Sequence, residues 1–172
     1  MTASPLSGLT AISPIDGRYR NKVDTLGNYF SEFALIRYRV IVEIRWLQCL
    51  AAHPQVTEAP AISSAGNQVL EDIIANFSIE DAQRVKDIEA TTNHDVKAVE
   101  YFLKERVSSH ADLATQIEFV HFACTSEDIN NLSYALMLKD GRDDVMLPLM
   151  QQLVDKLRDM AHELAEQPLL SR

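Results

Sequence analysis

The run Cys124-Thr125-Ser126-Glu127-Asp128-Ile129-Asn130-Asn131 contains the residue types best suited to holding an anion. Two hydroxyl side chains, Thr125 and Ser126, precede two acids and then an apolar helical pattern. A helix that begins here leaves backbone N–H groups free in its first turn, and such groups bind anions. An ordinary helix cap has the same composition, because Ser or Thr commonly stands at a helix start. Taken alone, this run leaves both interpretations open.

The upstream run Ser13-Pro14-Ile15-Asp16-Gly17-Arg18-Tyr19 is a second candidate. Pro14 and Gly17 are turn residues, so Arg18 and Tyr19 follow a bend in the backbone. Arg18 presents a fixed fork of donors and Tyr19 a hydroxyl, a combination suited to phosphate. A surface turn with an exposed arginine is the simpler structural interpretation of the same residues.

The third run is Thr91-Thr92-Asn93-His94-Asp95-Val96-Lys97. Its structural interpretation is a capping cluster, with Thr92 or Asn93 as the N-cap and Asp95 favoured by the helix dipole. Its functional interpretation uses His94 as a donor or proton carrier, because imidazole titrates near neutrality. The two interpretations are compatible, since capping by a neighbour leaves the imidazole free. Three polar loops in a helical chain suggest one assembled anion site.

Apolar residues recur at three- or four-residue steps, which predicts the helices that must position these loops. In the first predicted helix, Arg37, Arg39, Glu43 and Arg45 lie largely off the apolar stripe, whereas Tyr38 and Trp46 are expected in the core. Pro148 is a candidate kink. The fold prediction is all-α: an N-terminal helical domain over 1–114 and the start of a central helix bundle over 115–172. The helices are expected at 25–53, at 65–76, from a Ser78–Asp81 cap through Ile88, from Val96 to Val107 and at 113–122. The stretch 127–166 is expected as one very long helix or two nearly continuous ones.

Composition excludes several function classes. The 172 residues carry a formal net charge of −9 and a pI near 4.9, which argues against nucleic-acid or membrane-surface binding. No segment approaches the ~20 apolar residues of a membrane span, and no secretory signal is visible. Cys49 and Cys124 are expected as buried free thiols, which suits a cytoplasmic protein. No metal-ligand spacing or phosphate-binding Gly-rich loop occurs, so neither a metal nor a cofactor is expected.

Together, the three runs resemble the adenylosuccinate lyases of bacteria, a branch of the fumarase/aspartase superfamily. The resemblance rests on 13–19, on 91–102 and on 118–131, in that order, and extends to the closing Pro168-Leu169-Leu170-Ser171-Arg172. The first and last motifs are moderately specific, whereas all three in this order, with an N-terminus of this length, are highly specific.

The resemblance implies a lyase of purine nucleotide biosynthesis. It would eliminate fumarate from adenylosuccinate, giving AMP, and from the succinyl-carboxamide ribotide intermediate. Arg18 and Tyr19 would contact phosphate, and Asn93, His94 and Asp95 would line the nucleotide region. Thr125 and Ser126 would hold a carboxylate of the succinyl group, on which negative charge grows during proton removal.

The chain also departs from the family pattern. The family's Thr-His-Gly-Gln-Pro segment, with its general-acid histidine, should begin after Arg172, and the mobile loop with the catalytic serine lies further on. No catalytic acid or base is therefore expected in this chain, which is predicted to be an inactive N-terminal fragment. Its expected partners are the nucleotide substrate, the remaining C-terminal part of the same protein and further copies in a homotetramer.

Two other functions compete with this interpretation. One is another lyase of the superfamily, acting on argininosuccinate, fumarate or aspartate. The Arg18-Tyr19 turn and the Thr125-to-Asp128 sequence favour the nucleotide branch. The other is a non-catalytic helical interaction module, for which an acidic surface and a long helix would suffice.

Overall fold

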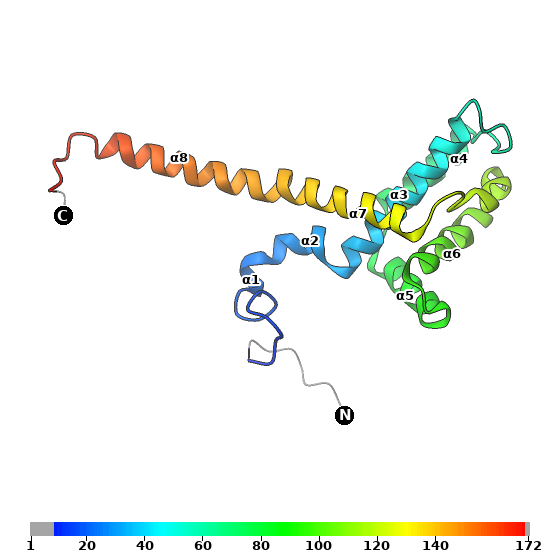
Figure 1. Cartoon of the computed structure of the whole chain (residues 1–172), viewed down its shortest axis with the longest axis horizontal. Coiled ribbons are helices and arrows are strands. Elements are labelled where there is room, and N and C mark those ends of the chain that lie inside the picture. Colours follow the sequence, from blue (N-terminus) through cyan, green and yellow to red (C-terminus); the bar gives the residue numbers. More distant parts are fainter. Residues whose placement is uncertain (1–8, 171–172) are drawn as a thin grey trace. The chain divides into compact units, whose positions relative to one another are not determined.

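The computed structural model describes residues 9–170, and every regular element within that range is helical (Figure 1). The all-α prediction is therefore confirmed for the described chain. The residues divide into two compact units, one formed by Gly27–Met137 and the other by the segments 9–26 and 138–170. The boundary expected near residue 114 remains a prediction. The elements in chain order are α1 (Arg20–Val23), η1 (Asp24–Leu26), α2 (Gly27–Phe30), α3 (Glu32–Ala52), α4 (Ser64–Ala75), α5 (Ile79–Thr92), α6 (Asp95–Ser108), η2 (Ala111–Phe119), α7 (Ser126–Gly141), η3 (Arg142–Met146) and α8 (Leu147–Glu163).

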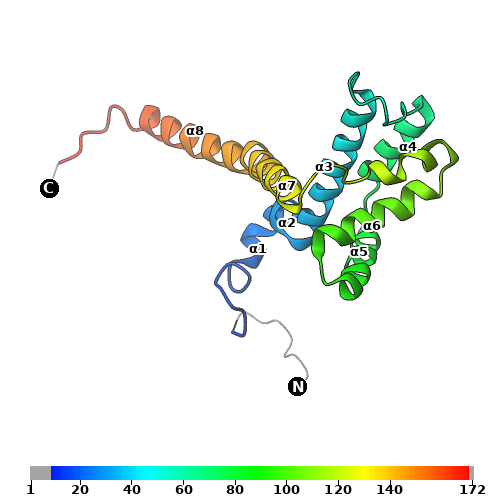
Figure 2. The same cartoon turned by 45° about the vertical axis from the view of Figure 1, so that its right-hand side comes forward.

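Helix α3 is the central element of the Gly27–Met137 unit and packs against α4, α5 and α6. The predicted helix 25–53 is interrupted at Ser31, whose side chain caps α3 by accepting from the Ala34 N–H. Figures 1 and 2 show α5 and α6 side by side as an antiparallel pair. The main core joins these helices, and its most deeply buried members include Val40, Leu70, Val99, Val107 and Leu113.

The predicted start of α5 is confirmed in detail. Ser78 accepts from the Asp81 N–H, and the Asp81 carboxylate accepts from the Ser78 N–H, which completes a capping box. The segment expected as a short helix over 113–122 is instead a 3₁₀ helix, η2, over Ala111–Phe119. Helices of this tighter type are typical of connectors, and η2 leads into the loop before α7.

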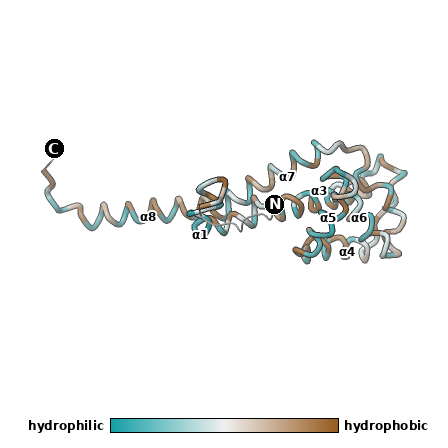
Figure 3. The backbone as a smooth tube through the Cα atoms, turned by 90° about the horizontal axis from the view of Figure 1, so that it is seen from below, coloured by the Kyte–Doolittle hydropathy of each residue, from teal (hydrophilic) through white to brown (hydrophobic). Residues whose placement is uncertain are grey.

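The 138–170 segment contains the end of α7, the π-helical turn η3 and α8. Pro148 lies in the first turn of α8 and cannot donate a backbone hydrogen bond. The π-helical turn lies directly before α8, and there the Leu147 N–H donates to the Arg142 carbonyl. Apolar and polar residues alternate along α8 (Figure 3). Several of its large apolar side chains are exposed: Leu149, Met150, Leu153, Val154, Leu157 and Met160.

None of the helices within residues 9–170 combines the length and apolarity that a membrane span requires. Both cysteines are free, as expected, but Cys49 is exposed and Cys124 is half-buried, which corrects the expectation of buried thiols.

Candidate active site

The start of α6 is built around His94. Helix α5 continues through Thr92, and Asn93 ends it in a left-handed conformation with φ of 51°, a role that Asn tolerates well. His94 is therefore the N-cap of α6, and its Nδ1 accepts from the Lys97 N–H at 3.2 Å. The expectation that Thr92 or Asn93 caps α6 is wrong, because both residues belong to the end of α5.

This cap determines which nitrogen of His94 can donate. A neutral imidazole has one donor and one acceptor nitrogen, and Nδ1 is the acceptor here. The proton of the neutral ring is thus assigned to Nε2, which lies 3.5 Å from the Ser126 Oγ. The side chain is half exposed, so Nε2 can also reach a ligand.

The start of α7 is built around Thr125 and Asp128. The backbone N–H and the hydroxyl of Thr125 both donate to Asp128 Oδ2, at 2.7 and 2.9 Å. These hydrogen bonds, the backbone one first, hold the pKa of Asp128 below its ordinary value. Ser126 is the first residue of the helix and makes neither of these contacts. Thr125 is therefore the capping residue, and the Ser126 hydroxyl is directed toward His94.

Two of the three sequence runs consequently meet in space. His94 Nε2 and Ser126 Oγ stand together where α6 and α7 begin. The first N–H groups of α7 and the positive end of its dipole lie at the same place as the Ser126 hydroxyl. This arrangement can hold a carboxylate or phosphate oxygen.

The loop that precedes Thr125 is held by α3. His121 and Ala123 adopt left-handed conformations with φ of 62° and 58°, which are costly for residues with a Cβ. Two contacts from α3 stabilise them: Glu43 Oε1 lies 2.6 Å from His121 Nδ1, and the Trp46 indole N–H donates to the Phe122 carbonyl at 2.8 Å. The expectation that His121 is a satisfied inner residue agrees with this contact.

Glu43 is almost completely buried, with 1 % of its surface exposed. Burial raises the pKa of the Glu43 carboxyl, and the hydrogen bond and charge of His121 only partly oppose that rise. Its second oxygen, Oε2, has no hydrogen-bond partner among the described residues. Burial also raises the pKa of the nearby Cys124 thiol, and the charge of Glu43 adds to that effect.

Arg39 connects the two helix starts. Its Nη2 donates to Asp95 Oδ2 at 2.6 Å, and its Nε donates to Asn130 Oδ1 at 3.0 Å. Burial alone would raise the pKa of Asp95, but the Val96 N–H hydrogen bond and the Arg39 charge outweigh it and leave that pKa lowered. Arg39 and Glu43 are both buried, which corrects the expectation that they lie off the packed face of α3.

Arg18 and Tyr19 belong to the other unit. Their turn is closed by the Tyr19 N–H donating to the Pro14 carbonyl, and by Ser13 donating to Asp16. Both side chains are exposed, and the Arg18 guanidinium lies 4.7 Å from the centre of the Tyr19 ring. The convergence of this turn with the other two runs stays a prediction.

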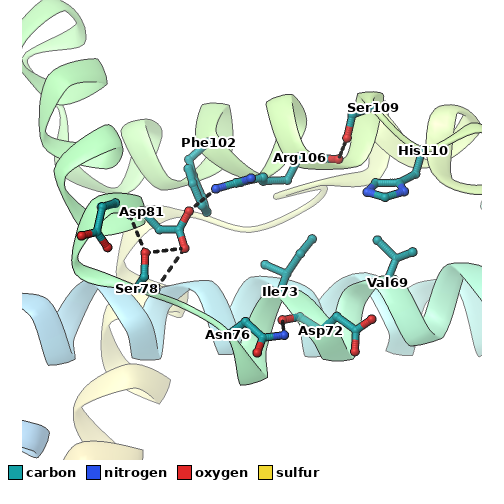
Figure 4. A pocket seen from close by; sticks show the side chains of 11 residues that line it. Val69, Asp72, Ile73, Asn76, Ser78, Asp81, Phe102, Arg106, Ser109 and His110 are labelled. Atoms are coloured by element: carbon teal, nitrogen blue, oxygen red, sulfur yellow. Dashed lines mark hydrogen bonds and ion pairs between the residues drawn. The ribbon is translucent and has the colours of Figure 1, made fainter.

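A cavity of about 550 Å³ lies between α4, α5 and α6 (Figure 4). None of the predicted site residues lines it. Its most conspicuous cation, Arg106, is paired with Asp81, which also closes the α5 capping box. Because none of the predicted site residues lies here and Arg106 is engaged by Asp81, this cavity is not taken as the candidate active site.

Comparison with known proteins connects this geometry to a family. A family model described as "Lyase" matches residues 17–172. The chain belongs to this lyase family. It is 59% identical over 167 residues to the adenylosuccinate lyase of Vibrio cholerae and 58% identical to that of Escherichia coli K12. The adenylosuccinate lyase of Legionella pneumophila strain Corby is 47% identical. Each alignment covers 97% of this chain and 37% of the relative, so the chain spans little more than a third of their length.

The resemblance drawn from the three runs is thus confirmed. Sequence reasoning missed Arg39, Glu43 and Trp46, which hold the two helix starts of the lyase chain. A usable signal was present: α3 is apolar on nearly all sides between Ile36 and Leu47. A helix of that kind is buried all round, so the charges within it require buried partners.

Proposed function

We propose that this chain supplies the N-terminal part of a cytoplasmic adenylosuccinate lyase of purine biosynthesis. The observation that carries the proposal is the identity of 57 to 59% with curated adenylosuccinate lyases across 97% of the chain. The complete enzyme would eliminate fumarate from adenylosuccinate and from the succinyl-carboxamide ribotide intermediate.

In this proposal the His94–Ser126 pair binds a carboxylate of the succinyl group. The Nε2–H of His94 and the Ser126 hydroxyl are both donors within reach of one ligand oxygen. Removal of a carbon-bound proton next to that carboxylate moves negative charge onto its oxygens. Donors fixed in advance stabilise that charge more than they stabilise the substrate, and so lower the barrier.

The other predicted site residues complete the assignment. Arg18 and Tyr19 contact the phosphate, and Asn93 and Asp95 border the nucleotide. Thr125 orients the turn that carries Ser126, through its two bonds to Asp128. The general acid and the catalytic base are expected from the part of the lyase beyond this chain, so no turnover is expected from the 172 residues alone.

We further propose that the apolar side chains of α8 are covered in the complete enzyme by the rest of the protein and by further copies in a homotetramer. Leu149, Leu153 and Leu157 are each more than half exposed. Full burial of such a side chain is worth about 1.5–3 kcal/mol relative to full exposure, so covering each of these partly exposed residues would gain part of that. Light scattering of the complete protein should give a tetramer, and a stable monomer would contradict this assignment.

The activity is tested with the complete protein that contains this chain, using adenylosuccinate and following AMP and fumarate by chromatography. The 172-residue chain alone is the matched control and should show no turnover. Turnover of argininosuccinate or aspartate in place of adenylosuccinate would move the protein to another branch. Clear turnover by the chain alone, free of the complete enzyme, would place the acid and base among residues such as His94.

A further inference from the structure

The guanidinium of Arg39 contacts the first turn of α6 and the second turn of α7. Its side chain is only 4% exposed, although it lies in the middle of α3. Asp95, which accepts from Nη2, is the first residue of α6, and Asn130, which accepts from Nε, lies in the second turn of α7. A single planar group therefore ties together two helices that begin far apart in the sequence.

The two acceptors are placed where they control the donor pair. Asp95 directly follows His94, the capping residue of α6. Asn130 lies four residues after Ser126, and residues four apart share a helix face. A shift of either helix relative to Arg39 would thus change the separation of His94 Nε2 and Ser126 Oγ, now 3.5 Å.

We propose that Arg39 is a positioning residue that sets the spacing of the His94–Ser126 donor pair. Asp95 acts through Arg39, because one of its oxygens binds Nη2 and the other accepts the Val96 N–H at 2.9 Å. The identity of the bound anion as a substrate carboxylate rests on the proposed function. The spacing role itself rests only on the contacts of Arg39.

The geometry requires an arginine. Its rigid fork presents Nε and Nη2 as two donors fixed in one plane, whereas a lysine ammonium is a single point charge on a flexible stem. Lysine at position 39 could keep the Asp95 contact or approach Asn130, but could not fix both. Lysine at position 39 keeps the positive charge but not the two fixed donors, so it tests whether the His94–Ser126 spacing depends on those donors and not on the charge.

The test compares Arg39→Met, Arg39→Lys and Asn130→Ala in the complete protein, with Arg84→Met as the matched control. Arg84 makes a two-point pair with Glu105, but that pair is half exposed and lies on α5 and α6 away from α7. Displacement of a binding group by about 1 Å can cost about 100-fold in rate. Arg39→Met should therefore lower kcat/KM about 100-fold and Arg39→Lys about 10-fold, mainly through kcat, because the donors act on charge that grows in the transition state. Arg84→Met should stay within about twofold.

Hydrogen exchange of the backbone amides supplies a readout that does not depend on activity. Arg39→Met and Asn130→Ala should both accelerate exchange at 95–97 and 126–128, while the core of α5 keeps its parent rate. The double variant with Asn130→Ala and Arg39→Met should have the same exchange rates and kcat/KM as Arg39→Met alone, because both substitutions remove the same contact.

The proposal fails if folded Arg39→Met retains parent exchange at both helix starts and kcat/KM within about twofold. If Arg39→Met does not fold, the milder Asn130→Ala decides the question by the same two measurements. If the parent protein does not cleave adenylosuccinate, the proposed function fails, and the exchange rates alone still confirm or overturn the spacing role of Arg39.

Discussion

Replacing Ser126 and Thr125 separately by alanine should divide binding from capping at the start of α7. Thr125 holds Asp128 through its N–H and its hydroxyl, whereas Ser126 is the first helical residue and makes no capping bond. The two hydroxyls are adjacent in the sequence, yet the structure gives them different roles. The paired substitutions therefore test the site assignment against the simple helix-cap interpretation.

The expected stability changes follow from these contacts. Thr125→Ala removes the 2.9 Å hydroxyl bond to Asp128 and should cost about 0.5–1.5 kcal/mol, the usual net loss for one hydrogen bond. Ser126→Ala loses only a 3.5 Å contact with His94, which is at the weak limit of a hydrogen bond. Alanine also has the higher helix propensity, by up to about 0.7 kcal/mol. The unfolding free energy of Ser126→Ala should thus stay within about 0.5 kcal/mol of the parent.

Activity should change in the opposite order. Loss of one donor to growing charge typically costs about 100- to 1000-fold, so Ser126→Ala in the complete lyase should lower kcat/KM by about 10- to 1000-fold. Thr125→Ala should lose less, because its hydroxyl is engaged by Asp128. Urea unfolding and steady-state kinetics on both variants provide the data. Parent-like activity for Ser126→Ala, together with a stability loss of about 1 kcal/mol, would refute this reasoning and make Ser126 a cap.

Three further substitutions test the Gly27–Met137 unit by equilibrium unfolding. Phe102→Ala should lower the free energy of unfolding by about 3–5 kcal/mol, because the ring is 1% exposed and packs edge-on against Phe77. A loss below about 1 kcal/mol would contradict this packing. Gly66→Ala places a Cβ 3.0 Å from atoms of Ile62 and Leu113. The overpacking should cost about 1–3 kcal/mol and outweigh the gain of about 1 kcal/mol in helix propensity, so the variant should be less stable. A more stable variant would show that both side chains move aside freely. Burial raises the pKa of Glu43 above its ordinary value of 4.5. The free energy of unfolding should therefore be highest below about pH 4.5 and should fall as the pH rises through the raised pKa. Glu43→Gln should remove this loss, and an unchanged pH dependence of unfolding would show that Glu43 is not the titrating group.

Local patterns predicted the helices and the α5 capping box because both depend on residues near one another in the sequence. Apolar periodicity identifies a helix without knowledge of its neighbours, and the Ser78–Asp81 box spans three residues. The three polar runs were visible for the same reason, as unusual residue types at helix starts.

The contacts that organise the candidate site could not be found in this way. Arg39 meets Asn130 across 91 residues, and Glu43 meets His121 across 78. A charge in an apolar helix indicates that a buried partner exists, but many acids and amides in the chain could serve. The capping role of His94 was missed for a smaller reason: α5 ends later than its apolar pattern indicates, and Asn93 takes the left-handed position.

The carboxylate of Asp128 has a further consequence, since it occupies both Thr125 donors in the free chain. A ligand carboxylate at the start of α7 therefore meets Ser126, and not Thr125, as its hydroxyl donor. The same two hydrogen bonds hold the pKa of Asp128 below its ordinary value. Asp128 consequently stays ionised, and the turn keeps both bonds, in solutions acidic enough to protonate an ordinary aspartate. The start of α7 is thus built to tolerate mild acid.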